Sequence, residues 1–319
     1  MTQKTMAVIG TGVIGNGWIA RFLANGHNVR AFDPAPGAEE KTIEYLTGVW
    51  DSLTDYGMAD NASMDNLTFV ETLEEAVQDV DLVQENVPER EELKQQVLSL
   101  ADEHAPATAI IASSTSGYMP SVLQENCHHH PERIIVAHPF NPVYLIPLVE
   151  LAGGKKTDRS VLEKAREIYD AMKMKPLVMS GEIDGHIGDR LMEAIWREAL
   201  HIVNDGVATT EEVDAAIVYG PGLRWALMGP FLTLHLAGGE KGMAHMLEQF
   251  GPALKLPWTR LVAPELTEEL RGKVIEGTAT QSGDSNIQEL EERRDRFLIK
   301  LMGLLDEEGF WPSEKLVRK

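Results

Sequence analysis

The sequence predicts an α/β protein in which a doubly wound, mostly parallel sheet is followed by an all-helical C-terminal domain. Two observations lead to this prediction. Short apolar runs alternate with helical patterns as far as about residue 184, which is typical of a parallel sheet with helices on both faces. No convincing strand pattern follows the segment from Gly181 to Gly185. We therefore expect two domains, at 1–184 and 185–319.

The expected elements of the first domain alternate regularly. Strands are expected at 5–10, 28–33, 67–70, 80–87, 109–113, 133–138 and 175–179. Helical patterns run from Gly15 to about Asn25 and occupy 38–58, 90–103 and 158–172. In the second domain, helical spacing covers 186–204, 210–218, 226–249 and 286–305, whereas the many Gly, Pro and Thr residues of 251–283 predict an irregular segment.

Composition and charge exclude several classes of protein. The 319 residues include 50 acidic and 29 basic side chains, so the formal net charge is −21, which disfavours nucleic acid and anionic membranes as partners. A single cysteine, Cys127, excludes an internal disulfide framework and a multi-cysteine zinc site, and fits a reducing compartment. The sequence shows no apolar run of about 18 residues and no signal-peptide pattern. We therefore expect a cytoplasmic protein.

A glycine-rich turn between the first strand and the first helix predicts a dinucleotide site. Gly10 permits the tight turn, Gly12 lets the backbone approach a pyrophosphate, and Gly15 lets the helix pack closely. Asp33 ends the next strand 18 positions after Gly15, where it can accept hydrogen bonds from a ribose diol and would repel a 2′-phosphate. NAD is therefore favoured over NADP, while FAD and a turn without a ligand remain alternatives. The candidate cofactor residues here are Gly10, Gly12, Val13, Ile14, Gly15 and Asp33.

A histidine and a glutamate form the second candidate constellation. His138 ends the strand at 133–138, and ligands collect at the carboxyl ends of strands in an open parallel sheet. Glu150 lies 12 residues later in an apolar stretch, where an unpaired carboxylate would be costly. A bond from Glu150 to one ring nitrogen would fix the tautomer of His138 and stabilise its imidazolium. A structural histidine with a solvated or capping glutamate is the alternative.

Two further polar runs, one of hydroxyl side chains and one of histidines, can be explained without a functional role. The run Ser113–Ser116 follows a strand, so its hydroxyls are candidates for a substrate oxygen or a cofactor phosphate, although helix capping is their commoner use. No Gly-x-Ser-x-Gly motif is present, so a serine nucleophile is not expected. The consecutive histidines at 128–130 precede Pro131 and cannot share one helix face. A solvated loop is favoured for them, and no metal site is assigned.

These motifs, in this order, resemble the 3-hydroxyacyl-CoA dehydrogenase family over nearly the whole chain. The matching segments are the turn at 10–15, Asp33, Glu85–Glu89 with Lys94, Ser113–Ser116, His138–Pro142, Glu150 and Asp184–Leu191. The resemblance implies a Rossmann-type domain that binds NAD and a homodimer built through the helical domain. It also implies that His138 acts as the base toward a substrate hydroxyl, that Glu150 orients it, and that Ser116 binds the substrate oxygen. Glu89 and Lys94 would contact the cofactor.

The expected helical domain indicates one branch of this family. Its segment 219–231 resembles a short-substrate branch that includes lambda-crystallin-like gulonate dehydrogenases and, as the closer resemblance, L-carnitine 3-dehydrogenases. This implies oxidation of the 3-hydroxyl of L-carnitine to 3-dehydrocarnitine. Aromatic faces recognise quaternary ammonium groups, and an arginine can hold a carboxylate through two hydrogen bonds. The candidate substrate residues are Ser116, Asn141, Asp189, Arg224, Trp225 and Phe231, with core packing, capping or a dimer salt bridge as alternatives for the last three.

One position departs from the family pattern. Asp189 stands where the family usually has an asparagine, just before Arg190 and Leu191. An ionised aspartate cannot donate the hydrogen bond that an amide can donate, but its negative charge favours a cationic substrate. L-gulonate and a short 3-hydroxyacyl compound or its CoA ester remain alternative substrates, although an acidic protein is a poor match for the phosphates of CoA. A non-catalytic, crystallin-like NAD-binding protein is the alternative outside enzymes.

Overall fold

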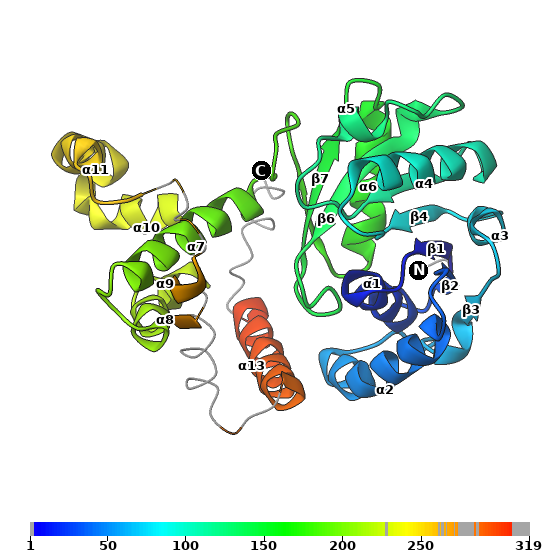
Figure 1. Cartoon of the computed structure of the whole chain (residues 1–319), viewed down its shortest axis with the longest axis horizontal. Coiled ribbons are helices and arrows are strands. Elements are labelled where there is room, and N and C mark those ends of the chain that lie inside the picture. Colours follow the sequence, from blue (N-terminus) through cyan, green and yellow to red (C-terminus); the bar gives the residue numbers. More distant parts are fainter. Residues whose placement is uncertain are drawn as a thin grey trace. The chain divides into compact units, whose positions relative to one another are not determined.

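A computed structural model describes residues 3–226, 229–260, 262, 265, 267–270, 272–273, 284 and 287–307. It divides into two compact units, Met1–Asp189 and Arg190–Lys319. The first unit is an α/β unit and the second is helical wherever the structure describes regular elements, as the sequence predicts (Figure 1). The helix α7 begins in the first unit and continues into the second.

The first unit is organised around one eight-stranded sheet with the order β3-β2-β1-β4-β5-β6-β7-β8. The strands are β1 (Thr5–Ile9), β2 (Asn28–Phe32), β3 (Leu67–Phe69), β4 (Leu82–Glu85), β5 (Ile110–Ser113), β6 (Ile134–Pro139), β7 (Leu148–Gly153) and β8 (Lys175–Val178). Strands β1 to β6 pair in parallel, whereas β7 runs antiparallel to β6 and parallel to β8. The chain order reverses direction at β1, which lies between β2 and β4. Such a switch point is where open sheets bind dinucleotides.

Helices and short 3₁₀ turns connect these strands. The helices of the first unit are α1 (Val13–Ala24), α2 (Ala38–Tyr56), α3 (Leu73–Val77), α4 (Glu91–His104), α5 (Pro120–Leu123) and α6 (Arg159–Ala171), with 3₁₀ turns η1 (Met64–Asn66) and η2 (Pro131–Arg133). The later elements are α7 (Gly188–Asn204), α8 (Thr210–Val218), α9 (Pro221–Trp225), α10 (Pro230–Ala237), η3 (Gly239–Lys241), α11 (Gly242–Phe250), η4 (Gly251–Lys255) and α13 (Ile287–Glu307).

Several elements differ from the sequence expectations, including the short helices α3, α5 and α9, which lie outside the expected helical ranges. Strand β7 was not expected, although it is the strand that faces His138. The helical pattern at 226–249 also spans two helices, α10 and α11, rather than one. They separate because a side chain on Gly238 would lie 1.9 Å from the carbonyl oxygen of Gly242, and Gly242 itself has a φ of +60°. Part of the segment 251–283 that we expected to be irregular, chiefly 274–283, lies outside the described residues.

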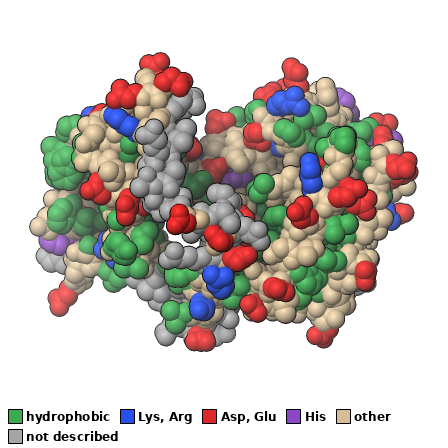
Figure 2. All heavy atoms as spheres, turned by 60° about the horizontal axis from the view of Figure 1, so that its bottom comes forward, with side chains coloured by type: hydrophobic (Ala, Val, Ile, Leu, Met, Phe, Trp, Pro, Cys, Tyr) green, Lys and Arg blue, Asp and Glu red, His purple; other side chains and the backbone are tan. Residues whose placement is uncertain are grey.

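The negative charge is distributed over the molecule. Figure 2 shows acidic side chains scattered across the visible face rather than gathered in a single patch. None of the helices in the described ranges is both long and apolar enough to cross a membrane.

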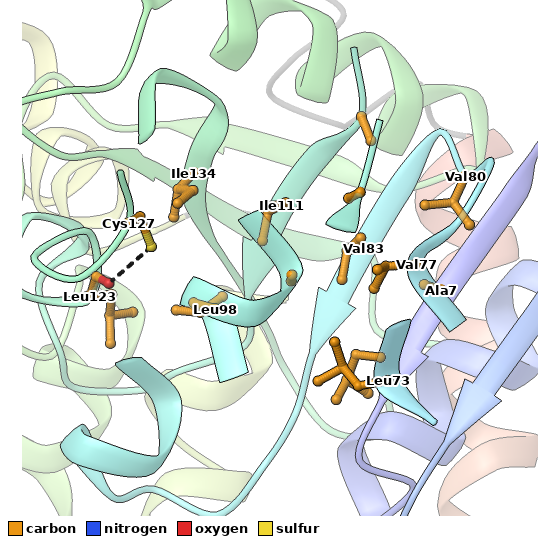
Figure 3. Close-up of a cluster of buried hydrophobic side chains, with 14 of the residues drawn as sticks. Ala7, Leu73, Val77, Val80, Val83, Leu98, Ile111, Leu123, Cys127 and Ile134 are labelled. Atoms are coloured by element: carbon orange, nitrogen blue, oxygen red, sulfur yellow. Dashed lines mark hydrogen bonds between the residues drawn. The ribbon is translucent and has the colours of Figure 1, made fainter. Parts of the chain in front are cut away.

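A hydrophobic cluster packs around the central strands (Figure 3). It includes Ala7 of β1, Val83 of β4, Ile111 of β5 and Ile134 of β6, all fully or almost fully buried. The thiol of Cys127 lies in the same cluster, 3.8 Å from the carbonyl oxygen of Leu123. Burial raises the pKa of this thiol to about 12, so Cys127 is an inert core residue.

Candidate active site

The glycine turn opens α1 at the carboxyl end of β1. Gly10 has a φ of +83°, and its amide donates to the carbonyl oxygen of Phe32, the last residue of β2. A side chain on Gly15 would lie 1.9 Å from the carbonyl oxygen of Gly10, so the helix packs directly against the turn. A side chain on Gly12 would meet no described atom within 4 Å. The turn is therefore closed on the Gly15 side and open at Gly12.

The first turn of α1 is suited to an anion. The N-cap residue Gly12 has no side chain to accept hydrogen bonds, and no acidic residue lies in the first turn. Val13 is exposed and Ile14 is half-buried beside it. Free backbone N–H groups and the positive end of the helix dipole therefore face the open part of the turn.

Asp33 lies next to this turn. Its Oδ2 accepts from the backbone amide of Thr11 at 2.7 Å and from the Thr11 hydroxyl at 3.2 Å, and its Oδ1 accepts from the amide of Ala35 at 2.9 Å. The carboxylate is half-buried and has lone pairs left for a diol.

His138 and Glu150 face each other across β6 and β7. They are directly paired in the antiparallel register, and His138 Nδ1 lies 3.0 Å from Glu150 Oε2. Both side chains are almost completely buried. The ring of Phe140 packs edge-on against the imidazole, with 5.0 Å between ring centroids. Because the carboxylate can only accept, Nδ1 carries a proton and Nε2 is the nitrogen available for chemistry.

Glu150 is held as an anion by three donors. Its Oε1 accepts from the backbone amides of Ile187 at 3.0 Å and Gly188 at 2.9 Å, at the start of α7. Burial alone would raise the pKa of Glu150, but the hydrogen bonds from His138 and from these amides outweigh it, so the pKa is lowered. A side chain on Gly188 would lie 2.5 Å from Phe140. Glycine therefore allows this close approach.

Asp189 lies on the other side of the imidazole. Its Oδ2 is 3.7 Å from His138 Nε2, and its side chain is 19% exposed. The two ring nitrogens of His138 therefore face two different carboxylates, one sealed in the sheet and one accessible. Asp189 is among the candidate substrate residues predicted from the sequence, and the structure brings its carboxylate close to Nε2 of His138.

The end of β5 and the loop after it supply hydroxyl groups, but most of them already have protein partners. Ser113 bonds to Glu85, Thr115 bonds to Glu89, and Ser114 donates to Asn86 Oδ1 at 2.7 Å. Ser116 is exposed. Its role toward a substrate oxygen stays a prediction. Asn141, after β6, is likewise exposed.

Lys94 and Glu89 belong to an internal ion-pair network. The ammonium of Lys94 is buried and lies 3.0 Å from Glu85 Oε1, 3.0 Å from the carbonyl oxygen of Val87 and 3.2 Å from Glu89 Oε2. Its three donors are thus matched by three protein oxygens. Glu89 is partly exposed and is the member of this network with accessible surface. The predicted cofactor contacts of both residues stay predictions.

The predicted residues of the second unit are exposed. Arg224 and Trp225 lie in the short helix α9, and Phe231, which is 81% exposed, lies at the start of α10. Their roles toward substrate stay predictions.

The sequence missed one residue close to the site. His186 is fully buried, its ring centroid lies 5.2 Å from that of His138, and its Nε2 lies 3.1 Å from the carbonyl oxygen of Thr115. It stands inside the Asp184–Leu191 motif, but a lone histidine there gave no signal of its own. Among the described residues, no group of three or more His, Cys, Asp or Glu side chains is placed to hold a metal ion.

Comparison with known protein families shows to which family this chain is related. Residues 5–183 match the NAD-binding domain of 3-hydroxyacyl-CoA dehydrogenase, and residues 185–277 match the C-terminal domain of the same family. The chain belongs to the 3-hydroxyacyl-CoA dehydrogenase family. The glycine turn and Asp33 thus lie in a segment that matches this family's NAD-binding domain.

Relatives within this family extend over almost the entire chain. An L-carnitine dehydrogenase of Bacillus cereus is 62% identical over 316 residues, which cover 99% of this chain and 96% of that protein. An L-carnitine dehydrogenase of Oceanobacillus iheyensis is 60% identical and covers 97% and 100%, respectively. Among solved structures, an NAD⁺-dependent 5-formyl-3-hydroxy-2-methylpyridine 4-carboxylic acid 5-dehydrogenase matches with a TM-score of 0.80 and 28% identity, covering 96% of this chain and 99% of that one.

Proposed function

We propose that this protein oxidises the 3-hydroxyl of L-carnitine to a ketone with NAD⁺ as hydride acceptor. The observation that supports the proposal best is the imidazole of His138, which lies between a buried carboxylate, Glu150, and an accessible one, Asp189. The first carboxylate suits a proton-accepting histidine, and the second suits a cationic substrate. The near-full-length similarity to L-carnitine dehydrogenases supports the same substrate.

The residues of the glycine turn fit NAD⁺. The open face at Gly12 and the uncapped amides of α1 suit the pyrophosphate, and Asp33 suits the ribose diol. When bound, NAD⁺ supplies the acceptor for the hydride that leaves the carbinol carbon. The phosphate of NADP would meet the charge of Asp33, which supports NAD⁺ as the cofactor.

Proton transfer is the part of the reaction that this chain performs itself. With Nδ1 protonated toward Glu150, His138 Nε2 has a free lone pair and takes the proton of the substrate hydroxyl. The imidazolium that forms is stabilised by Glu150, which is already ionised and held by the amides of Ile187 and Gly188. Ser116 donates a hydrogen bond to the substrate oxygen in this proposal. General-base assistance of this kind accelerates a reaction by about 10²-fold to 10⁴-fold.

Asp189 gives the site a preference for positive charge. A hydroxyl placed at Nε2 brings the rest of a small substrate within a few ångströms of the Asp189 carboxylate. Two unit charges about 5 Å apart at an effective dielectric constant of about 20 interact by about 3 kcal/mol. In this proposal the trimethylammonium group lies against Asp189, Arg224 holds the carboxylate, and Trp225 and Phe231 cover the methyl groups.

A direct assay tests the proposal. Formation of NADH is followed at alkaline pH with L-carnitine, L-gulonate and 3-hydroxybutyryl-CoA in parallel. We expect turnover with L-carnitine, and a His138→Ala variant should lose at least about 10²-fold in kcat while still binding NAD⁺. Turnover with L-gulonate or the CoA ester but not with L-carnitine would reject the substrate. Near wild-type turnover of the variant would reject the base.

A matched substrate pair tests the charge of Asp189 separately. The compound 3-hydroxy-5,5-dimethylhexanoate has the shape of carnitine, with carbon in place of the quaternary nitrogen. We expect Asp189→Asn to lower kcat/KM for L-carnitine by about 10-fold to 100-fold and to change it little for the analogue, whose tert-butyl group is uncharged. An equal loss with both compounds would contradict the electrostatic role. A homodimer in the cytoplasm is the proposed working form.

A further inference from the structure

His186 lies in the turn before α7 in a backbone conformation that residues other than glycine rarely adopt. Its φ is +48°, in the left-handed region, and the preceding Gly185 has a φ of +71°. The imidazole is fully buried. A non-glycine residue keeps such a conformation only where surrounding interactions fix it. The contacts of His186 must therefore account for its geometry.

Two hydrogen bonds join this turn to the loop after β5. The Nε2 of His186 lies 3.1 Å from the carbonyl oxygen of Thr115, and the amide of Gly185 donates to the carbonyl oxygen of Gly117 at 3.3 Å. A carbonyl oxygen only accepts, so Nε2 carries the proton of this imidazole. Its buried Nδ1 makes no hydrogen bond with any residue that the structure describes. Ser116 lies between the two tethered residues.

The same turn aims two backbone amides at Glu150. The residues directly after His186, Ile187 and Gly188, donate to Glu150 Oε1 at 3.0 Å and 2.9 Å. The other oxygen of that carboxylate is 3.0 Å from His138. One short turn therefore contacts the Ser116 loop on one side and holds the partner of His138 on the other.

We propose that His186 is a positioning residue whose Nε2–H bond to Thr115 fixes both the Ser116 loop and the amides that hold Glu150. This rests on the dehydrogenase function proposed above and adds a residue that touches neither substrate nor cofactor. The bond to Thr115 fixes the direction of the turn, and the turn fixes the positions of the amides of Ile187 and Gly188. These amides hold the Glu150 carboxylate in the position from which it orients His138.

The charge state of His186 agrees with this role. Burial lowers its pKa, and the neighbouring His138 lowers it further, while the bond to Thr115 and the carboxylates of Glu150 and Asp189 act in the opposite direction. These are the titratable groups that act on it from β6, β7 and α7. His186 therefore remains neutral when His138 takes a proton, and its hydrogen bond to Thr115 is kept throughout the catalytic cycle.

Two variants of equal shape isolate the hydrogen bond. Glutamine can place an amide N–H where the Nε2–H of His186 lies, whereas methionine has the same length and no donor. Both meet the same backbone penalty at a positive φ. We expect His186→Gln to retain most of kcat and His186→Met to lose about 10-fold to 100-fold. NAD⁺ affinity, measured by quenching of protein fluorescence, should be the same in both.

The pH profile separates positioning from mere folding. If the amides move away from Glu150 in His186→Met, the pKa of that carboxyl rises. The acid limb of kcat/KM should then move to higher pH in His186→Met and stay in place in His186→Gln. Equal kcat and superimposable profiles for the two variants would overturn the proposal, as would an equal loss of NAD⁺ affinity in both.

A measurement on the unmodified protein completes the test. We expect ¹⁵N NMR of the wild-type histidines, with His186 assigned by its absence in His186→Gln, to show a neutral ring with the proton on Nε2 between pH 6 and 8. A charged ring, or a proton on Nδ1, would overturn the proposal even if His186→Met does not fold. A wild-type enzyme that oxidises none of the three substrates would refute the proposed function. The NMR result would still decide whether Nε2–H of His186 donates to Thr115.

Discussion

Replacing Glu150 by glutamine should nearly stop turnover while leaving the fold intact. The carbonyl oxygen of the new amide is required at the position of Oε1, where the amides of Ile187 and Gly188 both donate. Its NH₂ group then faces His138 Nδ1 at about the present 3.0 Å. Nδ1 must accept, so the proton moves to Nε2, the nitrogen that has to receive the proton of the substrate.

Two contributions set the size of this effect. Loss of a charge-assisted hydrogen bond of about 1.5–3 kcal/mol corresponds to about 10-fold to 150-fold in rate. A histidine held in the wrong tautomer costs about 10⁴-fold in a comparable Asp–His arrangement. We therefore expect kcat of Glu150→Gln to fall by about 10² to 10⁴, measured as NADH formation at saturating substrate.

A control and a stability measurement make this prediction refutable. Glu167→Gln removes an exposed carboxylate from α6 and should leave kcat unchanged. Because the folded-state pKa of Glu150 is below its ordinary value of 4.5, its ionised form stabilises the fold above that pH, and this contribution is lost as the pH falls through the lower folded value. Urea unfolding should therefore separate wild type from Glu150→Gln at pH 7 and less so in acid. A folded Glu150→Gln enzyme within threefold of wild-type kcat would refute the reasoning.

Three further predictions concern packing and the cofactor turn. Arg21 is buried and donates to three backbone carbonyls at 3.0–3.2 Å. Arg21→Met should therefore destabilise the protein by about 3–5 kcal/mol in urea unfolding. The control Arg159→Met, at an exposed side chain, should cost less than about 0.5 kcal/mol. Gly15→Ala should abolish measurable NAD⁺ binding in calorimetry because the methyl group would overlap the turn, whereas Gly48→Ala, in open space within α2, should bind NAD⁺ normally and melt at a higher temperature. With a thiol pKa of about 12, Cys127 should resist iodoacetamide at pH 8 until urea unfolds the protein, and rapid labelling of the native protein would contradict its burial.

The sequence was most informative where function requires a local pattern. The spacing from Gly10 to Gly15, with Asp33 after the next strand, predicts the first βαβ unit because turn, helix start and strand end are adjacent in the chain. Strand β7 could not be recognised in the same way. It has six residues, carries the buried Glu150 at its third position and pairs antiparallel in a sheet that is otherwise mostly parallel. Its only signal was the cost of an unpaired carboxylate in an apolar run, which did suggest His138 as the partner.

The rest of the site depends on contacts between residues that lie far apart in the chain. The bond from His186 to Thr115 spans 71 residues, and the bond from Ser113 to Glu85 spans 28. No periodicity encodes such pairs, because each residue alone fits a capping or core role. The burial of Lys94 among three oxygen acceptors could not be predicted from the sequence either, since a lysine in an amphipathic helix is ordinarily expected to face solvent.

The amides that hold Glu150 have a practical consequence for dissecting the protein. The segment that matches the NAD-binding domain of the family ends at residue 183, four positions before Ile187. A fragment or chimera cut at that point would keep every strand of the sheet but leave a buried carboxylate without two of its donors. Domain-exchange experiments in this family should therefore place the junction inside α7, after Asp189, so that the nucleotide-binding half travels with the first turn of the helix that follows it.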